Sequence, residues 1–410
     1  MKVLLINNFH YRKGGSESVY FNTAELLCRA GHEVIFFSFA DPGIEECAEQ
    51  EYFAERRNGL LKSAADYFYN RNAARKLERL LQHERPDIAH IHLIWGGMSP
   101  SILRVLKRHS IPVVHTAHDY RMVCPAYTFR TPDGKICERC KGRRFYRCAL
   151  HSCSKGNRIQ SVIMAAEMYM RNICFNPARM LDGVIFVSRF SQQKHFQYAP
   201  QLQNVESTVL YNMAPDTDTR FMNNGRRAYF LYAGRLSGEK GVGLLISAFA
   251  SMPDMQLKIV GTGPDKEQLR QQAKGCPNIT FEGYKNGDEL RRIIADASFV
   301  IVPSQWYENN PMSIIEAYAY GVPIIGSNIG GIPEIVEEGV TGYLFETGNV
   351  RSLCTAVRQA AQLDMQEYTM LSNGARNFAS DNFERSNYAM RLTDFYSQCI
   401  TKVNKNSNGR

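Results

Sequence analysis

The chain has 410 residues, of which 44% are hydrophobic and 22% are charged, and this is the composition of an ordinary globular protein. The length predicts two domains of about 200 residues each, and no apolar run reaches the ~18 residues of a membrane-spanning helix. The net charge of +9 arises in residues 1–210, which hold 29 Lys and Arg against 19 Asp and Glu. This excess predicts either a basic face that attracts the phosphates of lipids, lipid-linked diphosphates or nucleic acid, or an ordinary solvated surface.

Short apolar runs alternate with helical patterns through the first half of the chain, beginning with VLLIN. The predicted strands are 3–7, 34–39, 88–93, 112–118, 183–188 and 207–212. The predicted helices are 16–30, a basic amphipathic helix at 61–82, one from a Ser99 cap to about 109, a long one at 157–180, and one from Ser191. The N-terminus lacks the long apolar region of a signal peptide, so we expect a cytoplasmic protein.

The second half repeats this alternation. The predicted strands are 228–234, 256–263, 298–304 and 322–327, and the predicted helices are 242–250, 312–320 and the segments from about 351. Apolar strands separated by helices indicate parallel sheets covered on both faces. We therefore expect an α/β protein with two doubly wound, Rossmann-like domains facing a cleft.

The predicted domain boundaries follow from these two series. Residues 1–208 form an acceptor-side domain with a Cys-rich insertion at 121–155, and residues 209–383 form a domain that binds a nucleotide sugar. Residues 384–410 are expected to form a helix that packs back on the first domain, followed by a polar tail. The tail after Lys402 is expected to be disordered.

Two cations lie on a glycine-bounded loop of the second half. In AGRLSGEKGV (233–242), Arg235 and Lys240 follow a strand and precede a helix. Cations beside the free N–H groups of a helix start form a good diphosphate site, although two cations five residues apart are a weak signal alone. Gly261 and Gly263 also follow a strand, where glycines let the backbone approach a ligand.

Two glutamates stand eight residues apart in WYENNPMSIIEAYAYGVP (306–323). Glu308 precedes the helix and Glu316 lies within it, among apolar residues. A buried carboxylate needs a hydrogen-bonding partner, which a ribose diol would supply. Asn309 and Asn310 lie where the N–H groups of the helix start are unpaired, so they can bind sugar hydroxyls or phosphate.

In their order, these motifs resemble family 4 glycosyltransferases, which are retaining enzymes of the GT-B fold. The resemblance rests on AGRLSGEKG, IVGTGP, FEGY, the two glutamates, GVPII and GGIPEIVEEGVTGYLF. It covers nearly the whole chain and is most specific in the second half. It implies that Arg235 and Lys240 contact the donor diphosphate, that Glu308 lies at the donor sugar and that Glu316 binds the ribose. By the same resemblance, Tyr284 lies near the base.

The first half contains matching segments. GGSES (14–18) is similar to the family's glycine loop, which implies that the backbone at Gly14 and Gly15 approaches the donor phosphate and the acceptor. HTAHDYRMVCP (115–125) resembles the segment that carries a histidine at the cleft, which implies that His118 binds and aligns the donor sugar. Without that resemblance, a histidine at a strand end is as readily explained by a structural hydrogen bond.

The resemblance implies retaining transfer from a UDP- or GDP-linked sugar without a metal cofactor. The expected acceptor is a glycan or a polyprenyl-diphosphate-linked glycan of a bacterial surface-polysaccharide pathway, reached by peripheral contact with the inner face of the plasma membrane. The Asp-x-Asp at 216–218 is the metal signature of the other glycosyltransferase fold. Here it follows Asn212 and Pro215, and we interpret these aspartates as residues that stabilise a turn.

Four cysteines cluster in the insertion with the spacing C-x2-C-x7-C-x4-C, at Cys137, Cys140, Cys148 and Cys153. Four thiols in a reducing compartment can form a structural zinc site, and Cys124 or His151 could replace one ligand. Free thiols and redox chemistry remain as alternatives.

Two other functions fit part of the sequence. A nucleotide-sugar epimerase of the same fold would turn over the donor without an acceptor, although the two glutamates and the Arg/Lys loop argue against it. A non-enzymatic nucleic-acid binder would use the basic half and the cysteines and show salt-dependent binding. That interpretation leaves the second Rossmann-like half without a purpose, so no nucleic-acid partner is expected.

Overall fold

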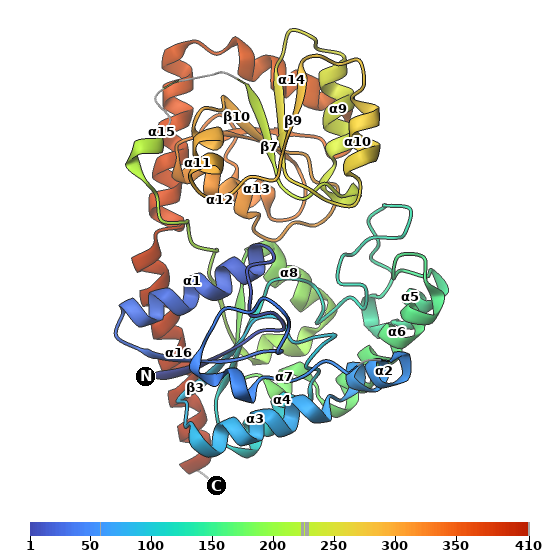
Figure 1. The fold of residues 1–410 in the computed structure, drawn as a ribbon, viewed down its shortest axis with the longest axis vertical. Coiled ribbons are helices and arrows are strands. Elements are labelled where there is room, and N and C mark those ends of the chain that lie inside the picture. The colour runs from blue at the N-terminus through green and yellow to red at the C-terminus, as the bar shows by residue number, and fades with distance from the viewer. Residues whose placement is uncertain (58, 223–224, 226–228, 409–410) are drawn as a thin grey trace. The chain divides into compact units, whose positions relative to one another are not determined.

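The computed structural model describes residues 1–57, 59–222, 225 and 229–408 (Figure 1). The chain forms two compact units. Unit 1 comprises Met1–Leu210 and the C-terminal segment from Arg385, and unit 2 comprises Tyr211–Glu384. The last helix of the chain, α16 (Arg385–Asn408), therefore belongs to unit 1.

Unit 1 is built on a six-stranded parallel sheet with the order β2-β1-β3-β4-β5-β6. Its strands are β1 (Lys2–Ile6), β2 (Glu33–Phe37), β3 (Ile88–Ile91), β4 (Val113–Ala117), β5 (Gly183–Phe186) and β6 (Glu206–Val209). Every residue of β3, β4 and β5 is buried, because helices cover both faces of a parallel sheet and both faces must then be apolar.

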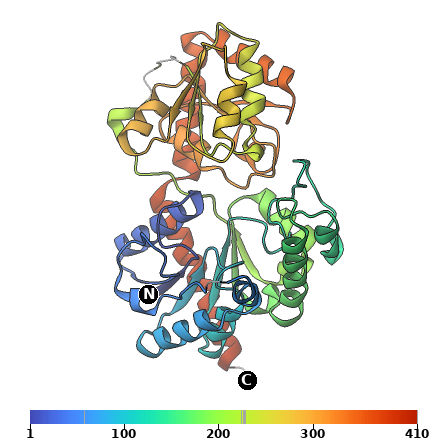
Figure 2. The same ribbon diagram turned by 45° about the vertical axis from the view of Figure 1, so that its right-hand side comes forward.

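The helices of unit 1 lie around this sheet (Figures 1 and 2). They are α1 (Gly15–Arg29), α2 (Leu60–Phe68), α3 (Arg71–His83), α4 (Ser101–Arg108), α5 (Tyr146–Leu150), α6 (Arg158–Cys174), α7 (Pro177–Met180), α8 (Arg189–Tyr198) and α16. Helix α16 packs against α1 and against the sheet: the Tyr388 hydroxyl lies 3.5 Å from that of Thr23, and the Tyr396 hydroxyl lies 2.6 Å from His90 Nδ1.

Unit 2 contains a second six-stranded parallel sheet, ordered β12-β11-β10-β7-β8-β9. Its strands are β7 (Phe230–Ala233), β8 (Leu257–Val260), β9 (Ile279–Gly283), β10 (Phe299–Val302), β11 (Ile324–Ser327) and β12 (Gly342–Phe345). The strand predicted at 228–234 is β7, and residue 228 lies outside the described residues. The two sheets confirm the predicted fold class of two doubly wound α/β domains.

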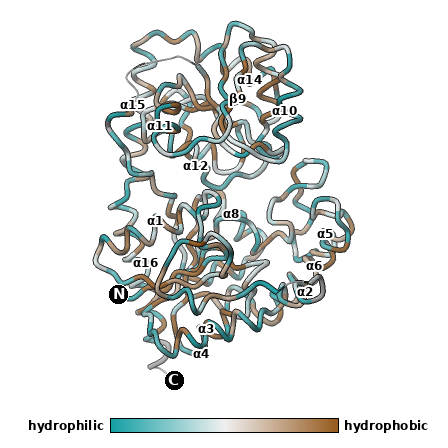
Figure 3. Tube along the Cα trace, in the orientation of Figure 1, coloured by the Kyte–Doolittle hydropathy of each residue, from teal (hydrophilic) through white to brown (hydrophobic). Residues whose placement is uncertain are grey.

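Two hydrophobic clusters hold the helices of unit 2 against opposite faces of its sheet (Figure 1). On one face lie α9 (Val242–Ala250), α10 (Lys266–Gln272) and α14 (Val350–Gln362). On the other lie α11 (Gly287–Ala295), α12 (Met312–Ala319), α13 (Ile332–Ile335) and α15 (Met365–Asn382). In Figure 3 brown, hydrophobic segments gather in the interior of each unit.

Two helices predicted as continuous are broken in the structure. The predicted helix 61–82 is α2 and α3, because Asn70 caps a new helix by accepting a hydrogen bond from the Ala73 N–H at 2.9 Å. The predicted helix 157–180 is α6 and α7, which meet at Asn176 and Pro177. Proline cannot continue the helix hydrogen bonding, and it pushes the preceding residue out of helical conformation.

Two further predictions at helix ends differ from the structure. The N-cap position of α4 is occupied by Pro100, although the hydroxyl of Ser99, the predicted cap, accepts the N–H of the first helical residue, Ser101, at 3.3 Å as well as that of Asn70 at 2.8 Å. The segment after Lys402 is not disordered as far as Asn408, because α16 continues through it. No proline or glycine interrupts the helix before residue 409. The predicted tail also includes residues 409–410, which lie outside the described residues.

Among the described residues, none of the helices is both long enough and apolar enough to cross a lipid bilayer.

Candidate functional site

Most of the predicted donor-site residues of unit 2 lie at one edge of its sheet. All six strands are parallel, so the loops that follow them emerge at the same edge. The chain runs from β7 outward through β8 and β9, and then from β10 outward through β11 and β12 on the other side. The switch point therefore lies between β7 and β10, which is where ligands bind in sheets of this kind.

Lys240 and Glu308 meet beside this switch point. Lys240 belongs to the short 3-10 turn η5 (Gly238–Lys240) that follows β7, and Glu308 follows β10. Lys240 Nζ lies 2.6 Å from Glu308 Oε1, and the Ser304 hydroxyl donates to the same oxygen at 2.7 Å. The Lys240 ammonium also lies 5.2 Å from the centre of the Trp306 ring. The sequence did not single out Ser304 or Trp306.

The environment of Glu308 keeps it ionised although it is buried. Burial by itself raises the pKa of a carboxyl, but the charge and hydrogen bond of Lys240, together with the Ser304 hydroxyl, outweigh burial and lower the Glu308 pKa. The Lys240 side chain stays 26% exposed, against 7% for Glu308. The pair is therefore an anchored carboxylate with a cation that remains accessible to a second anion.

Close backbone contacts hold the β7 loop next to the β10 loop. Gly241 has a φ of 71°, and a Cβ atom there would lie 1.9 Å from the Pro303 carbonyl oxygen. Only glycine fits such a position. Arg235, on the same β7 loop, has an exposed side chain, so the structure places one exposed and one half-buried cation on this loop.

Glu316 lies on α12, one turn past its start, with a carboxyl group in largely apolar surroundings. Burial raises its pKa from 4.5 to about 7, although the residue as a whole keeps intermediate exposure. Within the part of the chain that the structure describes, its carboxylate forms no hydrogen bond or ion pair with protein. A ligand hydroxyl that donated to this carboxylate would favour its charged form.

The two asparagines between these glutamates are both buried, with 8% of Asn309 and 6% of Asn310 exposed. The side-chain oxygen of Asn310 accepts the Asn212 N–H at 2.7 Å, and the Asn212 amide donates to the Asn310 carbonyl at 3.1 Å. These bonds tie the loop before α12 to the start of unit 2. The sequence predicted that Asn309 and Asn310 bind the donor sugar, but the side-chain oxygen of Asn310 already accepts a hydrogen bond from within the protein.

The glycines after β8 face protein backbone. A Cβ atom on Gly261 would lie 1.9 Å from the Gly234 carbonyl oxygen, and one on Gly263 would lie 2.1 Å from that of Leu236. The sequence interpretation assigned these glycines to close approach of a ligand, whereas the structure shows that loop packing already requires them. Tyr284, directly after β9, has 68% of its surface exposed. An exposed aromatic ring can stack on the planar ring of a ligand.

In unit 1, His118 lies just past the end of β4 and is paired with a histidine that the sequence did not single out. His118 Nε2 lies 2.8 Å from Nδ1 of His92, which follows β3. The two rings stack with their centres 5.1 Å apart. Burial lowers the His118 pKa to about 4, so the ring is neutral at pH 7 and its tautomer is fixed together with that of His92.

Gly14 and Gly15 form the start of α1 in the loop after β1. Gly14 is the N-cap residue and Gly15 the first helical residue, and both are exposed. The backbone N–H groups of a first helical turn lack partners within the helix, so this loop can donate to an anion.

The Asp-x-Asp at 216–218 behaves as a turn in the structure. Asp218 accepts the backbone N–H of Arg220 at 3.0 Å and forms an exposed ion pair with its guanidinium, in agreement with the turn interpretation.

The four predicted zinc ligands of the insertion line one pocket of unit 1 together with Cys124.

Comparison with known proteins places both units in glycosyltransferase families. Residues 13–214 match the model described as Glycosyltransferase Family 4, and residues 216–378 match the model described as Glycosyl transferases group 1. Together the two models span most of the chain.

Individual relatives agree with these families. The sulfoquinovosyl transferase of Arabidopsis thaliana is 26% identical over 355 residues, which are 84% of this chain but only 63% of that protein. The chain therefore spans less than two thirds of that relative. A GDP-mannose-dependent alpha-(1-6)-phosphatidylinositol monomannoside mannosyltransferase of Mycolicibacterium smegmatis is 25% identical over 417 residues, with 96% of this chain and 98% of that protein covered.

Solved structures share the fold. The crystal structure of Anabaena Alr3699/HepE in complex with UDP-glucose superposes with a TM-score of 0.69 at 20% identity, covering 97% of this chain and 100% of that one. At this identity the likeness shows a common two-domain α/β architecture.

Proposed function

This chain belongs to the family 4 glycosyltransferases of the GT-B fold, and we propose that it transfers a hexose with retention of configuration from a UDP- or GDP-linked sugar to a glycan or a polyprenyl-diphosphate-linked glycan. The observation that carries the proposal is the Lys240–Glu308 pair beside the switch point of unit 2. It provides an accessible cation for a departing diphosphate and a fixed carboxylate for sugar hydroxyls.

The proposed chemistry needs charge stabilisation more than a covalent group on the protein. The bond from the anomeric carbon to the diphosphate breaks, and a bond from that carbon to the acceptor hydroxyl oxygen forms on the same face. The hydroxyl proton passes to a diphosphate oxygen. Arg235, Lys240 and free backbone N–H groups stabilise the leaving charge, which is the largest single contribution in reactions of this type.

We assign the remaining site residues to binding and orienting the donor. Glu316 takes the ribose diol, Tyr284 lies under the base, and His118 donates to or accepts from a sugar hydroxyl as a neutral ring. Glu308 already holds Lys240 and Ser304 through one oxygen, so we assign it to binding a sugar hydroxyl and not to attack on the anomeric carbon. No metal takes part in transfer under this proposal.

Ligand-induced thermal stabilisation tests the donor class. We expect UDP or GDP, but not CMP, to raise the unfolding temperature, because a ligand that binds only the folded state stabilises it once its concentration exceeds Kd. Turnover of the matching nucleotide sugar should require an acceptor and give a product with the donor's anomeric configuration. Donor turnover without an acceptor would favour an epimerase, and no shift with any nucleotide diphosphate would contradict the proposal.

We also propose that unit 1, the acceptor-side domain, contacts an anionic membrane. Helix α6 exposes a stripe of large apolar residues, with Ile159 73% and Ile173 78% exposed. Leu150 of α5, which packs on α6, is 62% exposed. Exposed cations lie in the segment that leads into α6 and at its first residue: Arg139, Lys141, Arg143, Arg144, Lys155 and Arg158. An apolar stripe flanked by cations is the pattern of a helix that lies in an anionic lipid surface.

We expect Ile159→Asp/Ile173→Asp to lose most binding to phosphatidylglycerol vesicles in a sedimentation assay, because each change places a charge in the lipid-facing stripe. Met370→Asp is the matched control, since Met370 of α15 is 68% exposed but lies in unit 2. Undiminished binding of the double variant, or no binding of the parent protein, would contradict membrane contact at α6.

A further inference from the structure

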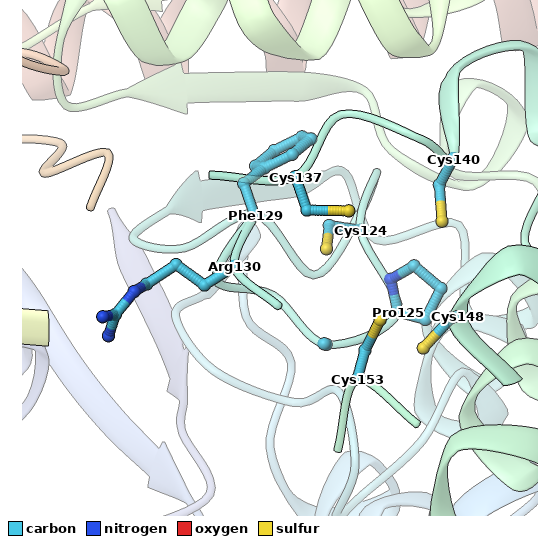
Figure 4. Close-up of a pocket in the computed structure, with 9 residues that line it drawn as sticks. Cys124, Pro125, Phe129, Arg130, Cys137, Cys140, Cys148 and Cys153 are labelled. Carbon is cyan, nitrogen blue, oxygen red and sulfur yellow. The ribbon is translucent and has the colours of Figure 1, made fainter. Parts of the chain in front are cut away.

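Five cysteines of unit 1 line one small pocket (Figure 4): Cys124, Cys137, Cys140, Cys148 and Cys153. Four of them form the spaced motif, whereas Cys124 lies near the start of the insertion, in the loop that leaves β4 and begins at His118. In Figure 4 their sulfur atoms point toward the space between them, and the Arg130 guanidinium points away from it. All five are free thiols.

The pocket is closed to most of the solvent. Cys148 is 1% exposed, and Cys124 and Cys140 are each 8% exposed. The remaining wall consists of Pro125, Ala126, Phe129 and the stem of Arg130. The wall contains no carboxylate or imidazole, so sulfur is the one type of side-chain ligand that the pocket offers.

Backbone hydrogen bonds hold together the segments that carry these cysteines. The Cys153 N–H donates to the Cys148 carbonyl oxygen at 3.2 Å, and the Cys137 N–H donates to the carbonyl oxygen of Phe129 at 2.7 Å. Phe129 itself lines the pocket. The fold of this segment therefore already gathers the thiols around one space.

The size and charge of the site favour a metal ion over an organic ligand. The space between the thiols has a volume of about 10 Å³, which is the room of one water molecule or ion and excludes organic ligands. Residues 121–160 contain ten Lys and Arg against two Asp and Glu, and Arg139 acts electrostatically on Cys153. Positive surroundings suit a metal centre with four thiolates, whose net charge is about −2.

We propose that unit 1 binds one Zn²⁺ ion in this pocket through four cysteine thiolates, one of which is Cys124. Within the described residues, no three His, Cys, Asp or Glu side chains are already spaced closely enough to hold a metal. Binding therefore draws the sulfurs inward, toward Zn–S distances of about 2.3 Å. Since a tetrahedral ion takes four ligands, one of the five thiols remains outside the coordination sphere.

Zinc at this position joins Cys124, in the loop after β4, to the spaced cysteines that follow it in the chain. Between β4 and α6, residues 118–157 contain a three-residue 3-10 turn and the five-residue helix α5 as their regular structure. Cys124 donates its backbone N–H to the Tyr120 carbonyl at 2.8 Å. A metal bound to Cys124 and to the spaced cysteines thus fixes the loop that starts at His118.

Metal content of the purified, reduced full-length protein tests the proposal. We expect about one zinc per chain by elemental analysis, released when a mercurial reagent titrates the thiols, and Co²⁺ exchange should give the visible bands and sulfur charge-transfer absorption of a tetrahedral thiolate site. Cys124→Ser should lose most of the zinc, and Cys174→Ser should keep it, since Cys174 is exposed and outside the pocket.

Cys124→His provides a second variant in case Cys124→Ser fails to fold, because imidazole can replace a thiolate as a zinc ligand. It should retain more metal than Cys124→Ser. Metal-free protein with five reactive thiols, or protein whose pocket cysteines pair as disulfides, would overturn the site. Stoichiometric zinc in Cys124→Ser would overturn the assignment of Cys124.

Discussion

We expect Lys240→Ala to lower kcat/KM for sugar transfer by about 10²–10³-fold, the loss typical of removing one group that stabilises developing negative charge. Lys240 Nζ is 2.6 Å from Glu308 Oε1 and remains partly exposed, so it can bind a diphosphate without leaving the carboxylate. The loss should appear in kcat as well as in nucleotide affinity, because the charge on the diphosphate increases as the bond to the sugar breaks.

The same variant should be destabilised by about 1–3 kcal/mol, because Glu308 is left buried without a cation, beside the neutral side chains of Ser304 and Trp306. Adding Glu308→Gln to Lys240→Ala removes the unpaired charge, so the double variant should regain stability without regaining activity. Denaturant unfolding and initial-rate kinetics on the same preparations separate the two effects.

Lys258→Ala is the matched control for Lys240→Ala. Lys258 also forms a Lys–Glu pair in unit 2, at 3.5 Å from Glu282 with comparable exposure, but it lies within β8. We expect its kcat/KM to stay within a few-fold of the parent protein. Near-normal transfer by Lys240→Ala, or an equal loss in Lys258→Ala, would show that the donor site has been assigned to the wrong residues.

The sequence predicted the sheets and most loop residues because the relevant signals are local. A buried parallel strand is a continuous apolar run, and the chemically important residues follow it directly. Arg235 could therefore be chosen from its position after a strand, whereas the roles of Glu308 and His118 came from the resemblance to the family. The strand β12 (Gly342–Phe345) was missed because it begins at a glycine, a residue that is depleted in strands, and directly follows a turn that contains Gly339.

Contacts between segments distant in sequence could not be predicted in the same way. Nothing in the sequence couples His92 to His118, which are 26 residues apart and meet because β3 and β4 are neighbours. The bond from Asn212 to Asn310 spans 98 residues. Cys124 lies outside the spaced cysteine motif, so the sequence named it as an alternative ligand, and the fold was needed to place it among the other four thiols.

The second large effect concerns Glu316, whose ionisation should control the pH dependence of donor binding. Burial raises its pKa from 4.5 to about 7 in the free protein. The folded state then binds more protons than the unfolded state between these values, so this group's contribution to stability falls as pH rises from 4.5 through 7. The cost above pH 7 is at most about 3 kcal/mol, and Glu316→Gln should relieve it, giving a more stable but binding-impaired protein.

Donor binding should change in the opposite direction with pH, because the ribose diol donates to the carboxylate and selects its charged form. With a pKa near 7, the ionised fraction of Glu316 rises about tenfold from pH 6 to pH 8, and affinity for a UDP- or GDP-sugar should rise with it. The diphosphate of a nucleotide sugar has no terminal phosphate that titrates near pH 6, so the sugar-linked form isolates the protein's contribution.

Isothermal titration calorimetry at pH 7, in buffers of different ionisation enthalpy, should therefore detect proton release on binding of the nucleotide sugar. Glu316→Gln should abolish that release and weaken binding by about 10²-fold, since two hydrogen bonds to a charged group are replaced by bonds to a neutral amide. Glu289→Gln, an exposed carboxylate on α11 of the same unit, should change neither quantity. Proton release that persists in Glu316→Gln would assign the titration to another group and remove Glu316 from the ribose site.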